Sequence, residues 1–144
     1  MDDAEVLSFL DEERIVTCAT LGPRGFPHLM PLWYVVRGTR PSHVWAWTFA
    51  KSQKVRNLER DPRATLQVEA GDEYQDLRGV MLECDVVLHR AGPLVQEFGE
   101  ALFRRYNGDA AADVVAAQAP KRVVLEFVER RRATWDHRKL AGVY

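Results

Sequence analysis

Alternating apolar and polar residues predict β-strands along much of this chain. The clearest run covers 79–90, where Val80, Leu82, Cys84 and Val86 alternate with a mostly more polar set. A period of two is typical of a half-buried strand, because successive side chains of a strand point to opposite faces. Turn segments such as GPRGFP and RGTRPS separate the first of these runs. The six predicted strands cover 14–21, 27–36, 43–50, 63–70, 79–90 and 121–135.

Helical spacing interrupts the strands in several places. Asp2 or Asp3 can cap the first helix, and the Asn-Gly pair at Gly108 is a fitting end for the longest one. Six short strands with few long crossovers favour an antiparallel barrel over a parallel sheet. The expected fold is therefore mostly β, a six-stranded antiparallel barrel with peripheral helices in a single domain over 1–144. The predicted helices cover 3–12, 53–60, 93–107 and 110–118.

Composition and charge exclude several classes of protein. The chain has 144 residues, 47% of them hydrophobic and 28% charged, which suits one globular domain. Its formal net charge of -1 gives no reason to expect nucleic acid as a partner. No apolar run approaches the ~20 residues of a membrane span, and no signal peptide is visible, so we expect a cytoplasmic protein without a membrane partner. Cys18 and Cys84 lie in strand-like runs and are interpreted as reduced core residues.

A compact cationic turn lies between two strand-like runs in 48–68. Ser52 can cap the helix that follows, by accepting a hydrogen bond from a backbone N–H near Lys54 or Val55. Lys54 falls in the first turn, where the helix dipole disfavours a cation. A phosphate held by the free N–H groups, the Ser52 hydroxyl and the Lys54 ammonium would explain that position. The alternative is a solvated basic turn in which Lys51 and Lys54 only add solubility.

Aromatic residues line one face of the strand before this turn. Trp45, Trp47 and Phe49 alternate with smaller or polar neighbours, so their rings project from the same side. A flat ligand ring could lie there, next to the anion site. The alternative is that this aromatic stripe belongs to the core.

Three segments together resemble the FMN-binding split-barrel superfamily related to pyridoxamine 5′-phosphate oxidase. They are GFPHLMPLWYVV, VWAWTFAKSQKVRNLERDPRATLQV and GVMLECDVVL, and the part KVRNLERDPRATL is the most specific. The similarity covers roughly residues 5–130. Within the superfamily the chain resembles the small deazaflavin-dependent proteins that use coenzyme F420. The resemblance implies a split β-barrel that works as a homodimer with cofactor sites at the interface.

The resemblance also implies which residues bind the cofactor. Lys54, in the Lys-x-Arg-Asn-Leu helix start, is placed at the cofactor phosphate, and the strand before the turn lines the ring site. The strand over 29–33 would supply backbone contacts to the ring edge. The predicted cofactor-binding residues are Leu29, Met30, Pro31, Leu32, Trp33, Trp47, Thr48, Lys51, Ser52, Gln53, Lys54, Asn57, Trp135, Arg138 and Lys139.

The C-terminal tail TWDHRKLAGVY is similar to the endings of some small members of the superfamily. Trp135, His137, Arg138 and Lys139 would suit contact with a cofactor bound across a dimer interface, and the alternative is an exposed basic tail. A lone barrel this short would leave apolar strand faces exposed to water. We therefore expect Trp33, Trp135 and the strand over 80–88 to lose accessibility when a homodimer forms.

The expected activity is hydride transfer between coenzyme F420, or alternatively FMN, and a small organic substrate. Coenzyme F420 is favoured because its lactyl-oligoglutamate tail needs cations outside the phosphate turn, which Lys51, Arg56, Arg138 and Lys139 could supply. The cofactor performs the chemistry, so no catalytic side chain is assigned. The alternatives are a flavin- or haem-binding protein without turnover and a purely structural barrel.

Two features limit this interpretation. The oxidase itself carries Arg-Lys at the phosphate turn, where this chain has Gln53-Lys54, and the chain lacks the oxidase's C-terminal substrate clamp. Oxidation of pyridoxamine phosphate is therefore not expected. The four His and two Cys show no metal-ligand spacing, so no metal site is expected either.

Overall fold

The computed structural model describes residues 1–109 and 111–143. Within them, seven strands form one sheet in which every neighbouring pair is antiparallel. The strands are β1 (Val16–Leu21), β2 (Pro27–Leu32), β3 (Tyr34–Val36), β4 (Val44–Phe49), β5 (Arg63–Ala70), β6 (Arg78–Arg90) and β7 (Arg122–Asp136).

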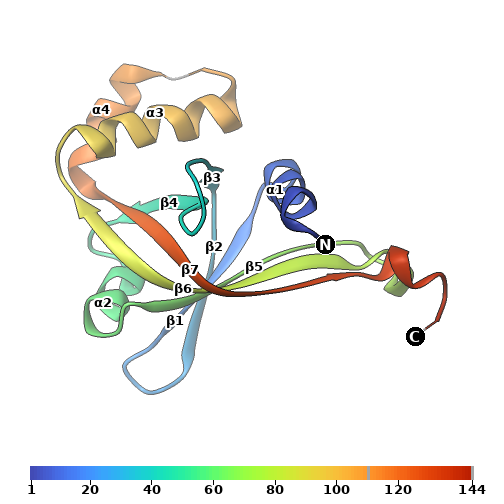
Figure 1. Ribbon diagram of the computed structural model, residues 1–144. Coiled ribbons are helices and arrows are strands. Elements are labelled where there is room, and N and C mark those ends of the chain that lie inside the picture. Colours follow the sequence, from blue (N-terminus) through green and yellow to red (C-terminus); the bar gives the residue numbers. More distant parts are fainter. Residues whose placement is uncertain (110, 144) are drawn as a thin grey trace.

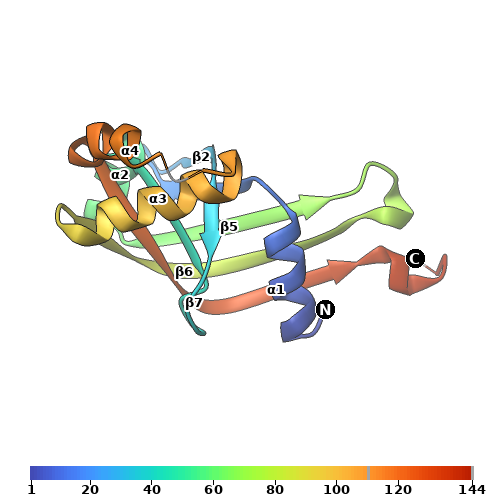
Figure 2. The same ribbon diagram turned by 90° about the horizontal axis from the view of Figure 1, so that it is seen from above.

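The two edge strands of the sheet are consecutive in the chain and are joined by a single residue. Along the sheet the strands follow the order β2-β1-β5-β6-β7-β4-β3, so β2 and β3 lie at opposite edges. In the sequence, only Trp33 separates the end of β2 at Leu32 from the start of β3 at Tyr34. The sheet must therefore curl until its edges come together, as Figures 1 and 2 show. This confirms the predicted fold class, a mostly β antiparallel split barrel with peripheral helices.

The strand count corrects the prediction of six. The run over 27–36 was expected to be one strand, but it forms β2 and β3. Leu32 of β2 lies opposite Val16 of β1, whereas Tyr34 of β3 lies opposite Ala46 of β4. Because β1 and β4 are far apart in the strand order, the chain has to leave one partner and join another at Trp33. Ring closure thus divides an apolar run that looks continuous in the sequence.

The helices agree with the predicted pattern. Asp2 caps the first helix: its carboxylate accepts a hydrogen bond from the Glu5 N–H. The Glu5 carboxylate in turn accepts one from the Asp2 N–H. The first residue of the predicted helix 110–118 lies outside the described residues. None of the described helices is long and apolar enough to cross a membrane. The helices are α1 (Asp3–Glu12), α2 (Gln53–Arg60), α3 (Pro93–Asn107) and α4 (Ala112–Gln118), with 3-10 turns η1 (Tyr74–Asp76), η2 (Ala119–Lys121) and η3 (His137–Leu140).

Buried apolar side chains form two clusters. The larger one fills the barrel, where α1 and α2 contribute residues such as Phe9 and Val55. The smaller one lies between the outer face of β4 and helix α3. Cys18 and Cys84 belong to the larger cluster, as predicted, and burial raises the pKa of each thiol to about 12. Both thiols therefore stay protonated at neutral pH.

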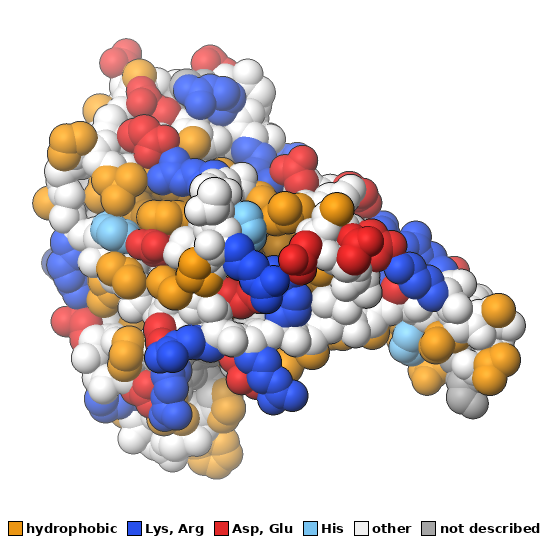
Figure 3. Space-filling model, viewed as in Figure 1, with side chains coloured by type: hydrophobic (Ala, Val, Ile, Leu, Met, Phe, Trp, Pro, Cys, Tyr) orange, Lys and Arg blue, Asp and Glu red, His pale blue; other side chains and the backbone are white. Residues whose placement is uncertain are grey.

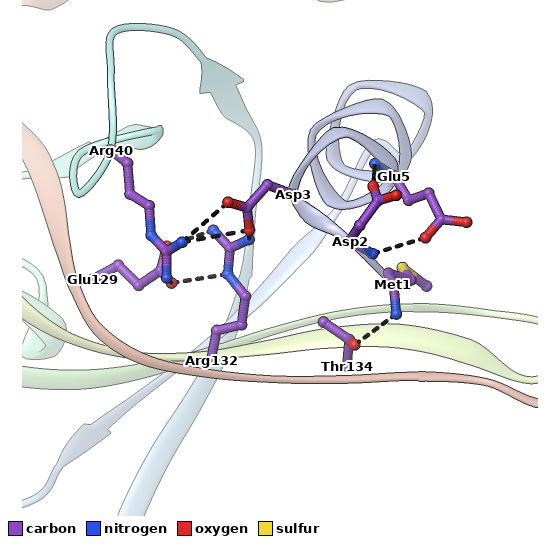
Figure 4. Close-up of polar contacts among 8 residues, drawn as sticks. All are labelled: Met1, Asp2, Asp3, Glu5, Arg40, Glu129, Arg132 and Thr134. Atoms are coloured by element: carbon purple, nitrogen blue, oxygen red, sulfur yellow. Dashed lines mark hydrogen bonds and ion pairs between the residues drawn. The ribbon is translucent and has the colours of Figure 1, made fainter.

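Strands β6 and β7 continue beyond the barrel as an arm. They contain 13 and 15 residues, and η1 and η3 lie together at the end of the arm (Figure 1). Helix α1 is tied to the base of this arm by ion pairs (Figure 4). Arg132 of β7 contacts Asp3 at 2.9 Å and Glu129 at 2.8 Å, and Arg40 contacts the same two carboxylates.

Candidate functional site

The start of helix α2 has the geometry that the sequence predicts. The Ser52 hydroxyl accepts a hydrogen bond from the Val55 N–H at 3.4 Å, so Ser52 is the N-cap. Val55 and Leu58 are buried in the barrel core, which fixes the orientation of the helix. The N–H groups of Gln53 and Lys54 lie in the first turn, where a helix offers no internal acceptor. These groups can therefore bind an anion at this end of α2.

The Lys54 side chain is buried, with only 4% of its surface exposed. Its Nζ donates a hydrogen bond to Thr48 Oγ1 at 3.2 Å, and none of the ion pairs among the described residues includes it. Loss of hydration lowers the pKa of this ammonium from its ordinary value. The solvated-turn alternative is therefore wrong for Lys54, although it fits the exposed Lys51.

A chain of amide and hydroxyl groups continues from the turn onto β1. Gln53 Nε2 donates to Asn57 Oδ1 at 2.8 Å, and Asn57 Nδ2 donates to Thr20 Oγ1 at 3.1 Å. Thr20 lies opposite His28 of β2, whose Nδ1 atom is buried and has no hydrogen-bond partner among the described residues. His28 was not among the predicted site residues. The unpartnered Nδ1 atom of His28, opposite Thr20 in the sheet, is a further group that a ligand could satisfy.

Five predicted residues line one cavity of about 250 Å³, which we call the Trp47 pocket. It opens between the β2–β3 junction, the outer face of β4 and helices α3 and α4. Its lining combines apolar rings with a few polar groups, the usual composition of a small-molecule site. The lining residues are Pro31, Leu32, Trp33, Trp47, Thr48, Leu102, Phe103, Gln118 and Arg122.

Trp47 is both a core residue and a wall of the pocket. It is 7% exposed and contacts Phe98 of α3, with ring centroids 6.3 Å apart. Helix α3 comes this close because it carries Gly99 at the contact: a Cβ there would lie 2.6 Å from Trp47 Cζ3. The core interpretation of the aromatic stripe therefore holds for Trp47, while part of its ring still faces the pocket.

Trp33 closes the pocket at the barrel seam. It remains 44% exposed and stacks on Tyr106 of α3, with ring centroids 4.3 Å apart and planes at 7°. The Tyr106 hydroxyl is fixed by the Tyr34 N–H, which donates to it at 3.0 Å. Leu29 and Met30, also predicted for the site, are exposed on β2 and do not line the pocket.

Arg122, which the sequence analysis did not single out, also lines the pocket. Its Nη2 donates to Gln118 Oε1 at 2.9 Å, and its guanidinium carbon lies 3.7 Å from the centroid of the Phe49 ring. The Nε atom is buried and has no partner among the described residues. Burial lowers the pKa of this guanidinium from its ordinary value. Arg122 precedes an alternating strand in the sequence, and a basic residue there gives no signal of a pocket.

The tail residues do not join this site within one chain. Arg138 pairs with Asp136 at 2.7 Å, and Lys139 pairs with Glu5 at 2.6 Å. Trp135 lies over Gly79, its neighbour on β6. In Figure 1 this part of the chain lies towards the end of the arm, away from α2. Within one chain these three residues therefore lie apart from the Trp47 pocket.

A second cavity, of about 550 Å³, lies over β1, β5 and β6. The charged groups at its rim already have partners: Arg63 contacts Asp61 at 2.7 Å, and Arg130 contacts Asp85. In the part of the chain that the structure describes, no group of three or more His, Cys, Asp or Glu could hold a metal ion. Of the three unpartnered buried side-chain atoms among the described residues, Arg122 Nε lies at the Trp47 pocket and His28 Nδ1 on β2, whereas Arg105 Nε lies on α3, whose Arg105 side chain contacts the end of α1.

Comparison with known proteins gives a family and a set of similar folds. The family model described as pyridoxamine 5′-phosphate oxidase matches residues 2–136. No curated protein matches the chain. Among solved structures, the conserved hypothetical protein Rv2991 from Mycobacterium tuberculosis is 39% identical, with a TM-score of 0.89 over 100% of this chain and 90% of that one.

Two more distant structures share the fold alone. An F420 reductase is 21% identical, with a TM-score of 0.67 over 88% of this chain and 94% of its own. The haem storage protein HutZ from Vibrio cholerae is 11% identical, with a TM-score of 0.71 over 93% of each chain.

Proposed function

The chain belongs to the pyridoxamine 5′-phosphate oxidase family, and we propose that it is a flavin- or deazaflavin-dependent oxidoreductase. Coenzyme F420 is the favoured cofactor and FMN the alternative. The observation that carries the proposal is the buried Lys54 ammonium, which has one neutral partner and lies at the capped start of α2. A cofactor phosphate would supply the negative charge that this ammonium lacks.

The phosphate would be held by groups from two elements. Helix α2 offers its first-turn N–H groups, the Ser52 hydroxyl and the side chains of Gln53 and Lys54. Strand β4 offers the Thr48 hydroxyl, which already contacts Lys54 Nζ. His28, with its unpartnered Nδ1, is an additional candidate on β2. These groups suit an anion because each can donate a hydrogen bond and the Lys54 ammonium also carries a positive charge.

The cofactor ring would lie along β2, towards the Trp47 pocket. Pro31, Leu32 and Trp33 line the pocket at one end, and the backbone of 29–33 can contact the ring edge. When bound, the cofactor supplies the hydride chemistry. The protein's own residues hold the phosphate, orient the ring and exclude water from the pocket, so no side chain is assigned an acid or base role.

We further propose that the site is completed in a homodimer. Strand β2 lies at an edge of the sheet and exposes apolar side chains, among them Leu29 with 59% of its surface accessible. Exposed apolar edge strands are normally covered in stable proteins. The arm projects from the barrel in Figure 3 and carries exposed Tyr74, Leu140 and Val143 near its end. A two-fold partner would cover both surfaces and bring Trp135 to the cofactor.

The preference for coenzyme F420 rests on cations outside the phosphate turn. Lys51 and Arg56 are exposed near the start of α2 and are available for the carboxylates of the oligoglutamate tail. Arg138 and Lys139 already pair with Asp136 and Glu5, so they would have to exchange partners to contribute. The argument therefore depends mainly on Lys51, which precedes α2, and on Arg56 within it.

The test is a titration of the purified apo-protein with FMN and with coenzyme F420 at matched salt. We expect coenzyme F420 to bind more tightly, and Lys51→Ala with Arg56→Ala to weaken coenzyme F420 without changing FMN, which has no glutamate tail. FMN binding at least tenfold tighter, about 1.4 kcal/mol, would overturn the deazaflavin assignment.

A second measurement separates an enzyme from a storage protein, the rival function suggested by the haem storage protein of similar fold. The visible absorbance of the loaded protein is recorded before and after adding reductant and candidate substrates. Repeated reduction and reoxidation of the bound cofactor, seen as changes in its absorbance, supports an oxidoreductase. A bound chromophore that no substrate reoxidises would support a storage function. If neither cofactor binds, the proposal of a flavin- or deazaflavin-dependent oxidoreductase is wrong.

A further inference from the structure

Arg122 is a half-buried cation at the wall of the Trp47 pocket without a carboxylate partner. None of the ion pairs among the described residues includes it, and its Nε has no hydrogen-bond partner. Its neighbours are the Gln118 amide and the faces of the Phe49 and Trp47 rings. We propose that the Trp47 pocket binds a small aromatic carboxylate, whose negative charge lies against the Arg122 guanidinium.

This anion is separate from the cofactor phosphate. Thr48, which contacts Lys54, lies opposite Val123, a residue of the barrel core. Phe49 lies opposite Arg122, and neighbouring residues of a strand point to opposite faces. Lys54 and Arg122 therefore approach β4 from opposite faces. Thr48 lines the pocket on the Lys54 side, but of the two cations only Arg122 is a lining residue. The anion proposed for the pocket is therefore assigned to Arg122.

The shape and lining of the pocket select the class of ligand. A volume of about 250 Å³ suits a single ring better than an extended chain. Trp33, Trp47 and Phe103 supply flat apolar walls, against which an aromatic ring packs well. A planar guanidinium binds a carboxylate with two parallel hydrogen bonds. These features favour an aromatic carboxylate over the flexible glutamates of a cofactor tail, which share the carboxylate but not the ring.

The position of the pocket gives this ligand a role that rests on the proposed function. Arg122 and Gln118 come from β7 and α4, whereas Pro31 and Leu32 come from β2, the strand proposed to carry the cofactor ring. A carboxylate held at Arg122 would direct the rest of the molecule towards that ring. The aromatic carboxylate would then bind next to the cofactor ring as a candidate substrate.

A structural role for Arg122 has to be distinguished from ligand binding. Its contacts with Gln118 and Phe49 could serve only to hold α4 and β4 against β7. That role predicts loss of stability on substitution but no response to anions. Ligand binding predicts a charge-dependent response in the wild-type protein as well, which requires no variant.

The experiment uses benzoate as the probe and the fluorescence of the cofactor-free wild-type protein as the readout, since two of its four Trp residues line the pocket. We expect benzoate to change the fluorescence saturably, and benzyl alcohol and triglutamate to bind at least tenfold more weakly. Arg122→Gln should weaken benzoate at least tenfold, the effect of losing a charge-assisted contact. Arg131→Gln, at an exposed position on the same strand, should leave benzoate affinity unchanged.

Three outcomes would overturn the inference. They are equal binding of benzoate and benzyl alcohol, equal or tighter binding of triglutamate, and unchanged benzoate affinity in a folded Arg122→Gln protein. If the Arg122→Gln protein unfolds, the affinities of the wild-type protein for benzoate, benzyl alcohol and triglutamate still test the inference. None of these results depends on cofactor binding, so failure here is distinguishable from failure of the cofactor titration.

Discussion

At the scale of single residues, the Lys54 ammonium is the feature that most needs an explanation. Withdrawing a charged group from water costs several kcal/mol even after relaxation. A hydrogen bond to a neutral hydroxyl returns only about 0.5–1.5 kcal/mol. The contact with Thr48 therefore does not offset the burial of Lys54. A residue retained against its own desolvation is typical of a binding site, because the ligand provides the missing charge.

Replacing Lys54 by Ala should therefore weaken cofactor binding without lowering the stability of the fold. Loss of a charge-assisted contact of about 1.5–3 kcal/mol predicts cofactor affinity roughly 10- to 150-fold weaker, with a larger effect at low salt. The free energy of unfolding should stay equal or increase, because a poorly compensated buried charge is removed. Fluorescence titration and urea denaturation measure the two quantities.

Lys121→Ala is the matched control for Lys54→Ala. Lys121 is exposed, and its described hydrogen bond uses the backbone carbonyl, which the substitution retains. We expect the Lys121→Ala protein to bind the cofactor with the same affinity as the wild type. Equal affinities for all three proteins would show that the phosphate does not bind at this turn.

The residues that the sequence predicted correctly are those whose role is local. Ser52 caps α2, and Val55 and Leu58 face the core, because capping and helical spacing depend on neighbours within a few residues. The burial of Lys54, the unpartnered His28 and the position of Arg122 depend on elements distant in the sequence. No local pattern distinguishes such cations from solvated ones.

At the scale of elements, the contact between α3 and β4 sets the shape of the Trp47 pocket. Leu102 and Phe103 come from α3 and Trp47 from β4, so the pocket depends on the distance between helix and strand. Gly99 determines that distance: a Cβ at this position would lie 2.6 Å from Trp47 Cζ3 and 2.5 Å from Val115 Cγ1. Contacts this short force one of the elements to move.

Gly99→Ala should consequently destabilise the protein, although Ala favours helices. The gain in helix propensity is about 0.5–1 kcal/mol, whereas overpacking a core typically costs about 1–3 kcal/mol. We expect a net loss of about 1 kcal/mol in the free energy of unfolding and a shifted tryptophan emission spectrum. Arg104→Ala, at an exposed position of α3, is the control. A Gly99→Ala protein as stable as this control, with unchanged emission, would contradict the prediction.

The sequence predicted most elements but not the division of the second strand. In 79–90 the alternation is strong, and β6 covers nearly the same residues. In 27–36 the apolar character continues through Trp33, so nothing local marks the point where β2 ends and β3 begins. That boundary exists because the barrel closes there, and closure depends on all seven strands of the described sheet.

At the scale of the whole molecule, the predicted site is divided between two places. Within one chain, α2 lies beside the barrel, whereas the C-terminal end of β7, which contains Trp135, lies on the arm (Figures 1 and 2). The resemblance to a dimeric family predicted both groups, but a single chain does not bring them together. One detail of the prediction needs correction: Val80, Leu82, Cys84 and Val86 are already buried in the barrel. Only the outward residues of β6, such as Met81 and Val87, can lose accessibility in a dimer.

The dimer is therefore expected to determine whether the site functions. Light scattering of the wild type at micromolar concentration should give twice the chain mass of 16.5 kDa. Leu29→Glu places a charge on the exposed β2 edge and should yield the monomer mass, because burying an unpaired carboxylate in an interface costs several kcal/mol. Val114→Glu is the control, since Val114 is 48% exposed on α4, which is not part of the sheet edge formed by β2. If a partner chain supplies Trp135, cofactor affinity should fall with the loss of the dimer in Leu29→Glu and persist in Val114→Glu. A wild-type protein that is monomeric yet binds its cofactor fully would refute the shared site.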